Sequence, residues 1–170
     1  LIGTESEFWT APEAGRAIRW LPKDLVLTLR PSVLAALPRV PPGPDRWAIL
    51  IALVRSGATE FTAELKAACE QGELGDAANE VLPILSMSDP AWTAEWVLQL
   101  VRRGEDVKED WLEFATNIPA ERIASLISMS LSDRSDLHRL RARLRALRRL
   151  APAETAQAAM AVLREEDQAL

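Results

Sequence analysis

A five-residue segment occurs twice in this chain, and its recurrence limits the architectures that the chain can form. Residues 53–57 read LVRSG and residues 100–104 read LVRRG, so the two copies begin 47 positions apart. A second pair, LSMS at 85–88 and ISMS at 127–130, is separated by 42 positions. Self-similarity with a period of roughly 40–47 residues is typical of helical-repeat proteins. Matches this short are compatible both with a true repeat and with a chance likeness between unrelated helices.

The composition predicts an all-α fold. Of the 170 residues, 48% are apolar and 26% are charged, as in an ordinary soluble globular protein. Ala, Leu, Glu and Arg are abundant and favour helices, whereas Tyr is absent and β-branched residues are few. We therefore predict antiparallel helical hairpins, stacked as a short right-handed solenoid or as a compact bundle, with a Pro-rich N-terminal extension.

Residues 1–45 differ from the rest of the chain. They contain seven of the eleven prolines, which disfavour long helices because each removes a backbone donor. We predict short helices at 13–19 and 32–37 and a short strand or extended segment at 25–29. Residues 1–45 are thus expected to be a separate segment that packs on a helical domain of residues 46–170.

Beyond the extension, prolines and glycines divide the chain into regular apolar stretches. Pro44, Pro90, Pro119 and Pro152 each open one such stretch. The predicted helices run over 44–56, 59–71, 75–87, 90–103, 107–117, 119–131, 134–150 and 152–168. Pro83 predicts a kink or an early break in the third of these.

The ends of these helices carry capping signals. Asp89 is the expected N-cap of the helix that starts at Pro90. Asp106 and Glu109 have the spacing of a capping box. Gly57 and Gly104 are expected to end their helices in a left-handed conformation.

The helix predicted at 134–150 carries a basic band in an acidic chain. Residues 131–150 hold seven Arg and two Asp (net +5), whereas residues 1–130 carry net −7 and residues 151–170 net −3, which together give the chain's −5. Leu137, Leu140, Leu144 and Leu147 form an apolar stripe on this helix. Five arginines flank one edge of the stripe, and Arg139 and Arg143 lie on its other side. The five are Arg134, Arg141, Arg145, Arg148 and Arg149.

Two interpretations of this band stay open. In the first, the arginines bind an anion, either an acidic protein partner or nucleic acid, because arginine favours bidentate contact with carboxylate and phosphate. In the second, they pair with acids of neighbouring helices, such as Glu154, Glu165, Glu166 and Asp167. The overall negative charge argues against a dedicated nucleic-acid-binding protein.

Trp92 and Trp96 lie on one face of a predicted helix, and Trp111 lies on the next helix. Aromatic residues at this spacing are typical of inter-helix packing, but they also form partner-binding grooves. We keep Trp92 and Trp96 as candidate partner-binding residues and expect Trp47 to lie in the core.

Catalytic and cofactor motifs are missing from the sequence. There is no glycine-rich phosphate loop and no nucleophile elbow. His138 is the single histidine and Cys69 the single cysteine, so a metal site of the usual ligands is not expected. We expect no catalytic residue, no metal and no cofactor, although carboxylates that converge only in the folded chain would leave a small helical enzyme or effector open.

Residues 44–131, with their two echoed segments, resemble a pair of HEAT-like or armadillo-like helical units. This resemblance implies a curved helical scaffold that binds proteins, and it transfers no active-site residue.

Since the chain begins with Leu, we expect it to be a piece of a longer protein. The expected function is a non-enzymatic, cytoplasmic interaction module that binds an acidic partner or a sister domain through the Arg-rich helix. The alternative is a nucleic-acid accessory domain that uses the same helix. The apolar runs are too short for membrane association to be expected.

Overall fold

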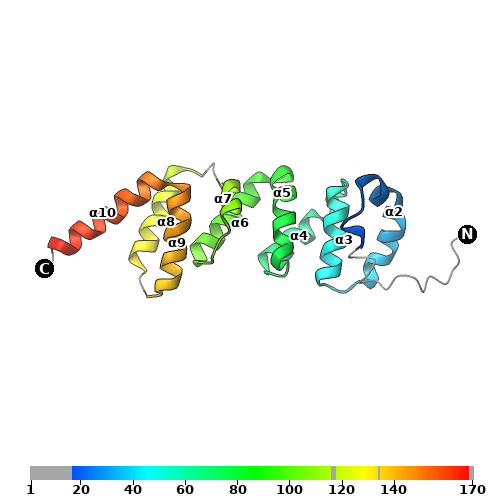
Figure 1. Ribbon diagram of the computed structural model, residues 1–170, viewed down its shortest axis with the longest axis horizontal. Helices are drawn as coiled ribbons and strands as arrows, with labels where there is room; N and C mark the ends of the chain where they lie inside the picture. The colour runs from blue at the N-terminus through cyan, green and yellow to red at the C-terminus, as the bar shows by residue number, and fades with distance from the viewer. Residues whose placement is uncertain (1–16, 116–117, 134, 169–170) are drawn as a thin grey trace, which may run out of the picture. The chain divides into compact units, whose positions relative to one another are not determined.

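The computed structural model describes residues 17–115, 118–133 and 135–168, with side chains up to residue 161. Within these residues the secondary structure is helical, with no strand, so the predicted all-α class is confirmed (Figure 1). None of the described helices is long and apolar enough to cross a membrane. The chain divides into two compact units, Leu1–Met87 and Ser88–Leu170. The separate segment predicted at 1–45 stays a prediction.

The first unit is built around α3, which spans Pro44–Arg55. Its residues 47–54 are all buried, because α3 contacts α2 (Lys23–Ala36) on one side and α4 (Thr62–Glu70) on another. An uninterrupted apolar run is what a helix surrounded by neighbours requires. Burial of each Leu, Ile or Val side chain contributes about 1.5–3 kcal/mol. The expected core position of Trp47 is confirmed by its exposure of 5%.

The strand or extended segment predicted at 25–29 was wrong, and the short helix predicted at 32–37 is the end of a longer one, because α2 is one helix of 14 residues with Pro31 inside it. Alternating leucines indicated a strand, but Val26 is the buried residue and Leu25, Leu27 and Leu29 are exposed. Pro31 itself is exposed. A proline there removes one helical hydrogen bond, and its acceptor carbonyl at Leu27 lies on an exposed residue that water can reach. The helix predicted at 13–19 lies mostly outside the described residues.

Of the kink or early break predicted at Pro83, the break does not occur. Helix α5 runs from Ala78 to Ser88 without interruption. The proline is exposed, whereas Val81, Leu82 and Leu85 on the same helix are buried. Packing of these side chains holds the helix together across the position where one backbone donor is missing.

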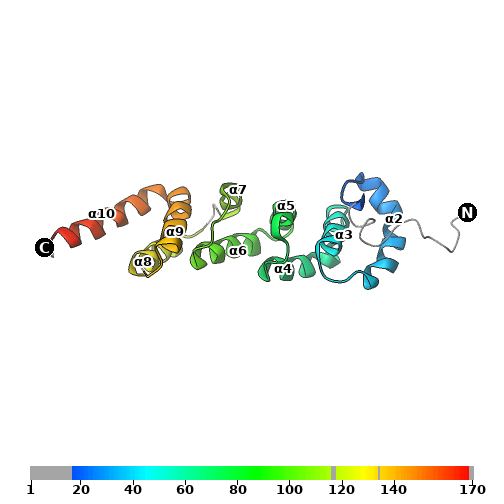
Figure 2. The same ribbon diagram turned by 60° about the horizontal axis from the view of Figure 1, so that its bottom comes forward.

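The second unit consists of α6 (Pro90–Arg103), α7 (Glu109–Leu112), α8 (Ala120–Ser132), α9 (Leu137–Leu150) and α10 (Pro152–Gln168). Helix α9 contacts each of the other four, and α8 and α9 lie side by side (Figures 1 and 2). Because α9 contacts the other four helices, its side chains take part in much of the packing within this unit.

The two copies of the echoed segment form the same helix end. In the first copy, Gly57 N–H donates to the Val54 carbonyl at 2.9 Å and Ala58 N–H to the Leu53 carbonyl at 3.0 Å. In the second, Gly104 N–H donates to Val101 at 3.0 Å and Glu105 N–H to Leu100 at 3.1 Å. Both glycines have positive φ, +108° and +73°, as expected for left-handed helix ends.

The second echo is less regular. Leu85 and Ile127 are both buried, but LSMS ends α5 whereas ISMS lies inside α8. Met87 is 88% exposed and Met129 37% exposed. A repeat of the whole HEAT-like unit therefore stays a prediction that local likeness alone does not test.

N-terminal capping follows the sequence at one of the two helix starts where it was expected. The Asp89 carboxylate accepts a hydrogen bond from Trp92 N–H at 3.0 Å and caps α6, as predicted. The capping box of Asp106 and Glu109 was wrong, since α7 begins at Glu109 and Lys108 occupies the N-cap position. Asp106 instead pairs with Arg145 across the unit.

Candidate functional site

The arginines of helix α9 lie on two sides of the helix, one buried and one exposed. The helix begins after Asp136, whose carboxylate accepts hydrogen bonds from the backbone N–H groups of His138 and Arg139 at 2.9 and 3.1 Å. With 100° of rotation per residue, Ala142, Arg143, Ala146 and Leu147 form the buried side. The exposed side carries four of the five arginines predicted to bind a partner, Arg141, Arg145, Arg148 and Arg149. Arg134 lies outside the described residues.

Arg143 is the structural arginine of the helix. Its side chain is 9% exposed. Nε donates to the Arg102 carbonyl at 3.0 Å, and Nη1 donates to Asp133 Oδ2 at 3.1 Å. The Arg102 carbonyl belongs to the last turn of α6, where carbonyls lack helical partners and positive charge is favourable. Arg143 therefore stabilises the end of α6, a role that the sequence did not reveal.

Arg145 and Arg149 form exposed ion pairs with acids near α7. Arg145 Nη1 lies 2.9 Å from Asp106 Oδ1, and Arg149 Nη2 lies 2.6 Å from Glu109 Oε1. All four side chains are more than half exposed. Exposed pairs of this kind contribute about 0–1 kcal/mol.

These ion pairs show that the arginines do pair with neighbouring acids, although with other acids than the sequence suggested. Glu154 forms no ion pair with any described residue, and the side chains of residues 165–167 lie outside those described. Arg141 and Arg148 are exposed and likewise form no ion pair with any residue that the structure describes.

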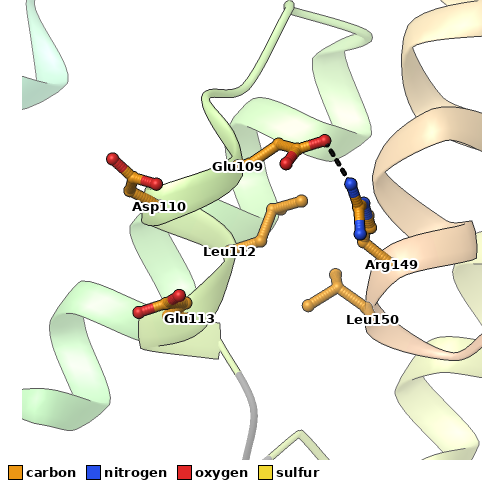
Figure 3. A pocket seen from close by; sticks show the side chains of 6 residues that line it. All are labelled: Glu109, Asp110, Leu112, Glu113, Arg149 and Leu150. Carbon is orange, nitrogen blue, oxygen red and sulfur yellow. Dashed lines mark hydrogen bonds and ion pairs between the residues drawn. The ribbon is translucent and has the colours of Figure 1, made fainter.

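A cavity of about 290 Å³ lies between α7 and α9 (Figure 3). It is lined by Glu109, Asp110, Leu112, Glu113, Arg149 and Leu150. Figure 3 shows that Glu109 reaches Arg149, whereas the carboxylates of Asp110 and Glu113 point away from that arginine. The walls between them are the apolar side chains of Leu112 and Leu150. The arrangement neutralises one carboxylate and leaves two facing outward.

The leucine stripe predicted for α9 is only partly buried. Leu147 is fully buried, but Leu140 and Leu144 are half-buried and Leu137 is 63% exposed. Two alanines, Ala142 and Ala146, are instead among the buried residues of α9. The predicted stripe thus overlaps the buried side at Leu147, and the rest of that side is formed by Ala142, Arg143 and Ala146.

The three tryptophans form one packed row. The Trp92 and Trp96 rings are stacked with centroids 6.2 Å apart, and the centroids of Trp96 and Trp111 are 5.5 Å apart. Trp96 is 7% exposed, and the other two are half-buried. This placement favours inter-helix packing over a partner-binding groove, since the Trp96 ring has little surface left to offer.

Two further side chains, Cys69 and His138, are the single cysteine and the single histidine of the chain. Burial raises the pKa of the Cys69 thiol to about 12, and the charge of Glu70 adds to the effect. His138 is exposed in the first turn of α9. Among the described residues, no group of three or more His, Cys, Asp or Glu side chains could hold a metal ion.

Comparison with known proteins adds no family. No protein-family model, no curated protein and no solved structure matches this chain.

Proposed function

We propose that this chain is a non-enzymatic helical module that binds an acidic protein partner, or an acidic domain of the same protein, through the exposed arginines of α9. The observation that carries the proposal is the state of Arg141 and Arg148. Both are exposed, and both lack an ion pair among the described residues. Guanidinium groups held on a rigid helix lose less conformational freedom on binding a carboxylate than groups on a loop.

Arg145 extends this surface, and its use in binding costs the folded unit little stability. Arg145 is paired with Asp106, but both side chains are more than half exposed and the pair contributes little to folding. A carboxylate of a partner can replace Asp106 without destabilising the unit. Arg141, Arg145 and Arg148 together thus form the binding surface that we propose.

The HEAT-like resemblance belongs to the same proposal. Helical scaffolds of that kind bind proteins on exposed helix faces, and the matching ends of α3 and α6 support a common helical unit. The lone cysteine offers no intramolecular disulfide, in keeping with the cytoplasmic location that we also propose.

The test is binding of a fluorescent oligoglutamate peptide, followed by anisotropy. We expect the triple variant Arg141→Glu, Arg145→Glu, Arg148→Glu to lose binding while its helical circular dichroism is unchanged. The matched control reverses three exposed arginines off this surface, Arg39, Arg103 and Arg139, and should bind as the parent chain does. Equal binding by both triple variants would remove the surface from consideration.

A duplex DNA of similar charge serves as the second probe. The chain carries a net charge of −5, and its basic surface is confined to one helix. We therefore expect DNA to bind more weakly than the peptide at 150 mM salt. Stronger retention of the DNA would favour the nucleic-acid function instead.

A further inference from the structure

The exposed side of α9 carries a continuous ridge in which leucine and arginine alternate. Leu137, Arg141, Leu144 and Arg148 follow one another at steps of four, three and four residues. At 100° per residue they fall within an arc of about 60°, and they extend over about 16 Å of helix. Leu137 is 63% exposed, both arginines are exposed and Leu144 is half-buried. We call these four residues the Leu–Arg ridge.

The Leu–Arg ridge contributes little to the packing of the second unit. The buried side of α9 is formed by Ala142, Arg143, Ala146 and Leu147. The charged contacts to α6, to α7 and to the segment between them come from Arg143, Arg149 and Arg145, respectively. A leucine left 63% exposed in the first turn of a helix gains little from the fold.

The spacing of the ridge is that of a helix-pairing seam. Steps of four and three residues repeat every seven and keep a seam facing one partner helix. In this register the leucines occupy one seam position and the arginines the other, while Arg145 flanks the seam on one edge and Leu140 on the opposite edge. Charged residues at a seam position select the partner, because they are tolerated only opposite a complementary charge.

Charge decides between the candidate occupants. A second copy of the ridge would bring arginines against arginines, in a segment that carries net +5 over residues 131–150. A helix with glutamates and leucines at the same spacing would pair each arginine with a carboxylate and cover both leucines. We infer that the acidic partner of the proposed function binds as an amphipathic helix along the Leu–Arg ridge, an inference that rests on that function.

The experiment compares two acidic peptides of about three heptads with the same composition. In the first peptide, Glu and Leu alternate along one helical face, and in the second the order is scrambled so that no such face exists. Fluorescence anisotropy measures the affinity of each peptide for the full chain. The circular dichroism spectrum of the mixture, minus the spectra of the chain and the peptide alone, measures the helix gained on mixing. We expect the ordered peptide to bind more tightly by about tenfold and to gain helix.

Variants separate the apolar part of the ridge from its charge. Leu137→Ala should weaken the ordered peptide by about fivefold and leave the scrambled peptide unchanged, since only an ordered face can contact this leucine. Leu25→Ala on α2 is the matched control, because Leu25 is similarly exposed, at 49%, and lies off the ridge. The double variant Arg141→Glu, Arg148→Glu should lose the ordered peptide and recover binding to its counterpart with Lys in place of Glu.

The outcomes distinguish this inference from the proposed function. If both peptides bind equally, Leu137→Ala has no effect and arginine reversal abolishes both, the partner is acidic but not a helix on the ridge. If arginine reversal changes neither peptide, both the inference and the proposed function are wrong. Sedimentation of the chain with phosphatidylserine vesicles, with no binding of either peptide, would also overturn both.

Discussion

Arg143 and Arg145 have different roles, because Arg143 faces the buried side of α9 and Arg145 faces the exposed side. Arg143 is nearly buried and donates to a helix-end carbonyl and to Asp133. Arg145 is 66% exposed and pairs with an acid that is itself 70% exposed. The same side chain is therefore a structural group at one position and an available binding group at the other.

This difference predicts unequal effects of the same substitution. Arg143→Met leaves the Arg102 carbonyl without its donor and should lower the free energy of unfolding by about 2 kcal/mol. Arg145→Met should change it by less than about 0.5 kcal/mol. Urea unfolding followed by circular dichroism measures both. Equal effects would show that Arg143 is not the structural arginine.

The pKa of Asp133 gives a prediction about pH. Hydrogen bonds from Ser135, and then from Arg143, lower this pKa below its ordinary value of 3.8. Because the folded-state pKa is the lower one, the contribution of Asp133 to stability is present above pH 3.8 and is lost as the pH falls through the folded-state value.

Ser135→Ala removes the largest cause of this shift. We expect the Asp133 pKa in the variant to move up toward 3.8, as measured by carboxyl NMR titration, and the pKa of Asp136 to stay lowered by its own backbone hydrogen bonds. A Ser135→Ala variant with an unchanged Asp133 titration would contradict this assignment.

Gly57 and Gly104 form a matched pair at the ends of α3 and α6. Both have positive φ, but the surroundings differ: a Cβ on Gly104 would lie 2.6 Å from Arg139 Cβ, whereas a Cβ on Gly57 would meet nothing within 4 Å. Gly57→Ala should cost about 1–2 kcal/mol from backbone strain alone. Gly104→Ala should cost about 2 kcal/mol more, because Arg139 must move. Thermal and urea unfolding check the order, and a larger cost at Gly57 would show that the close approach of α9 to this turn is wrong.

At the scale of the element, α2 shows how packing overrides a breaker. Its sequence contains a proline and alternating leucines, yet it is one helix with Val26 buried and Pro31 exposed. The helix is retained because its inward side chains pack on α3, while the missing hydrogen bond falls where solvent replaces it.

This balance predicts that α2 is more stable without its proline. Pro31→Ala restores a helical hydrogen bond and should raise the free energy of unfolding by about 1–2 kcal/mol, after the gain in unfolded-state entropy is subtracted. The control is Pro22→Ala at the N-cap position, which should be nearly neutral because no helical donor is required there. A destabilising Pro31→Ala would mean that the ring itself packs against the unit.

At the scale of the whole molecule, the charge is unevenly distributed along an acidic chain. The sequence isoelectric point is about 5.0. Each Arg→Glu reversal changes the net charge by two units, so the triple variant at Arg141, Arg145 and Arg148 carries −11 where the parent carries −5. We expect the solubility minimum of the parent near pH 5 to move to a lower pH in the variant, as measured by turbidity. An unmoved minimum would indicate that net charge does not govern the solubility of this chain.

Local rules applied to the sequence predicted the all-α class and most of the helix ends. Pro90 after Asp89 and the two glycines after LVR act within one turn of the chain, so local rules located the starts and ends of α6 and α3. The eight helices predicted from residue 44 onward correspond to observed elements for the same reason, apart from the late starts of α7 at Glu109 and of α9 at Leu137.

Which side of each helix is buried depends on the neighbouring helices, and the sequence did not predict it. The sequence shows a leucine stripe on α9, but α9 buries Ala142, Arg143, Ala146 and Leu147 in the unit where it contacts α6, α7, α8 and α10, and Leu137 stays exposed. Periodicity measures how apolar residues are spaced along one helix and carries no information about the size and position of its neighbours. For this reason the arginines could be predicted as a group from the sequence, whereas their separation into a structural residue and a binding ridge depends on contacts between residues some 40 positions apart.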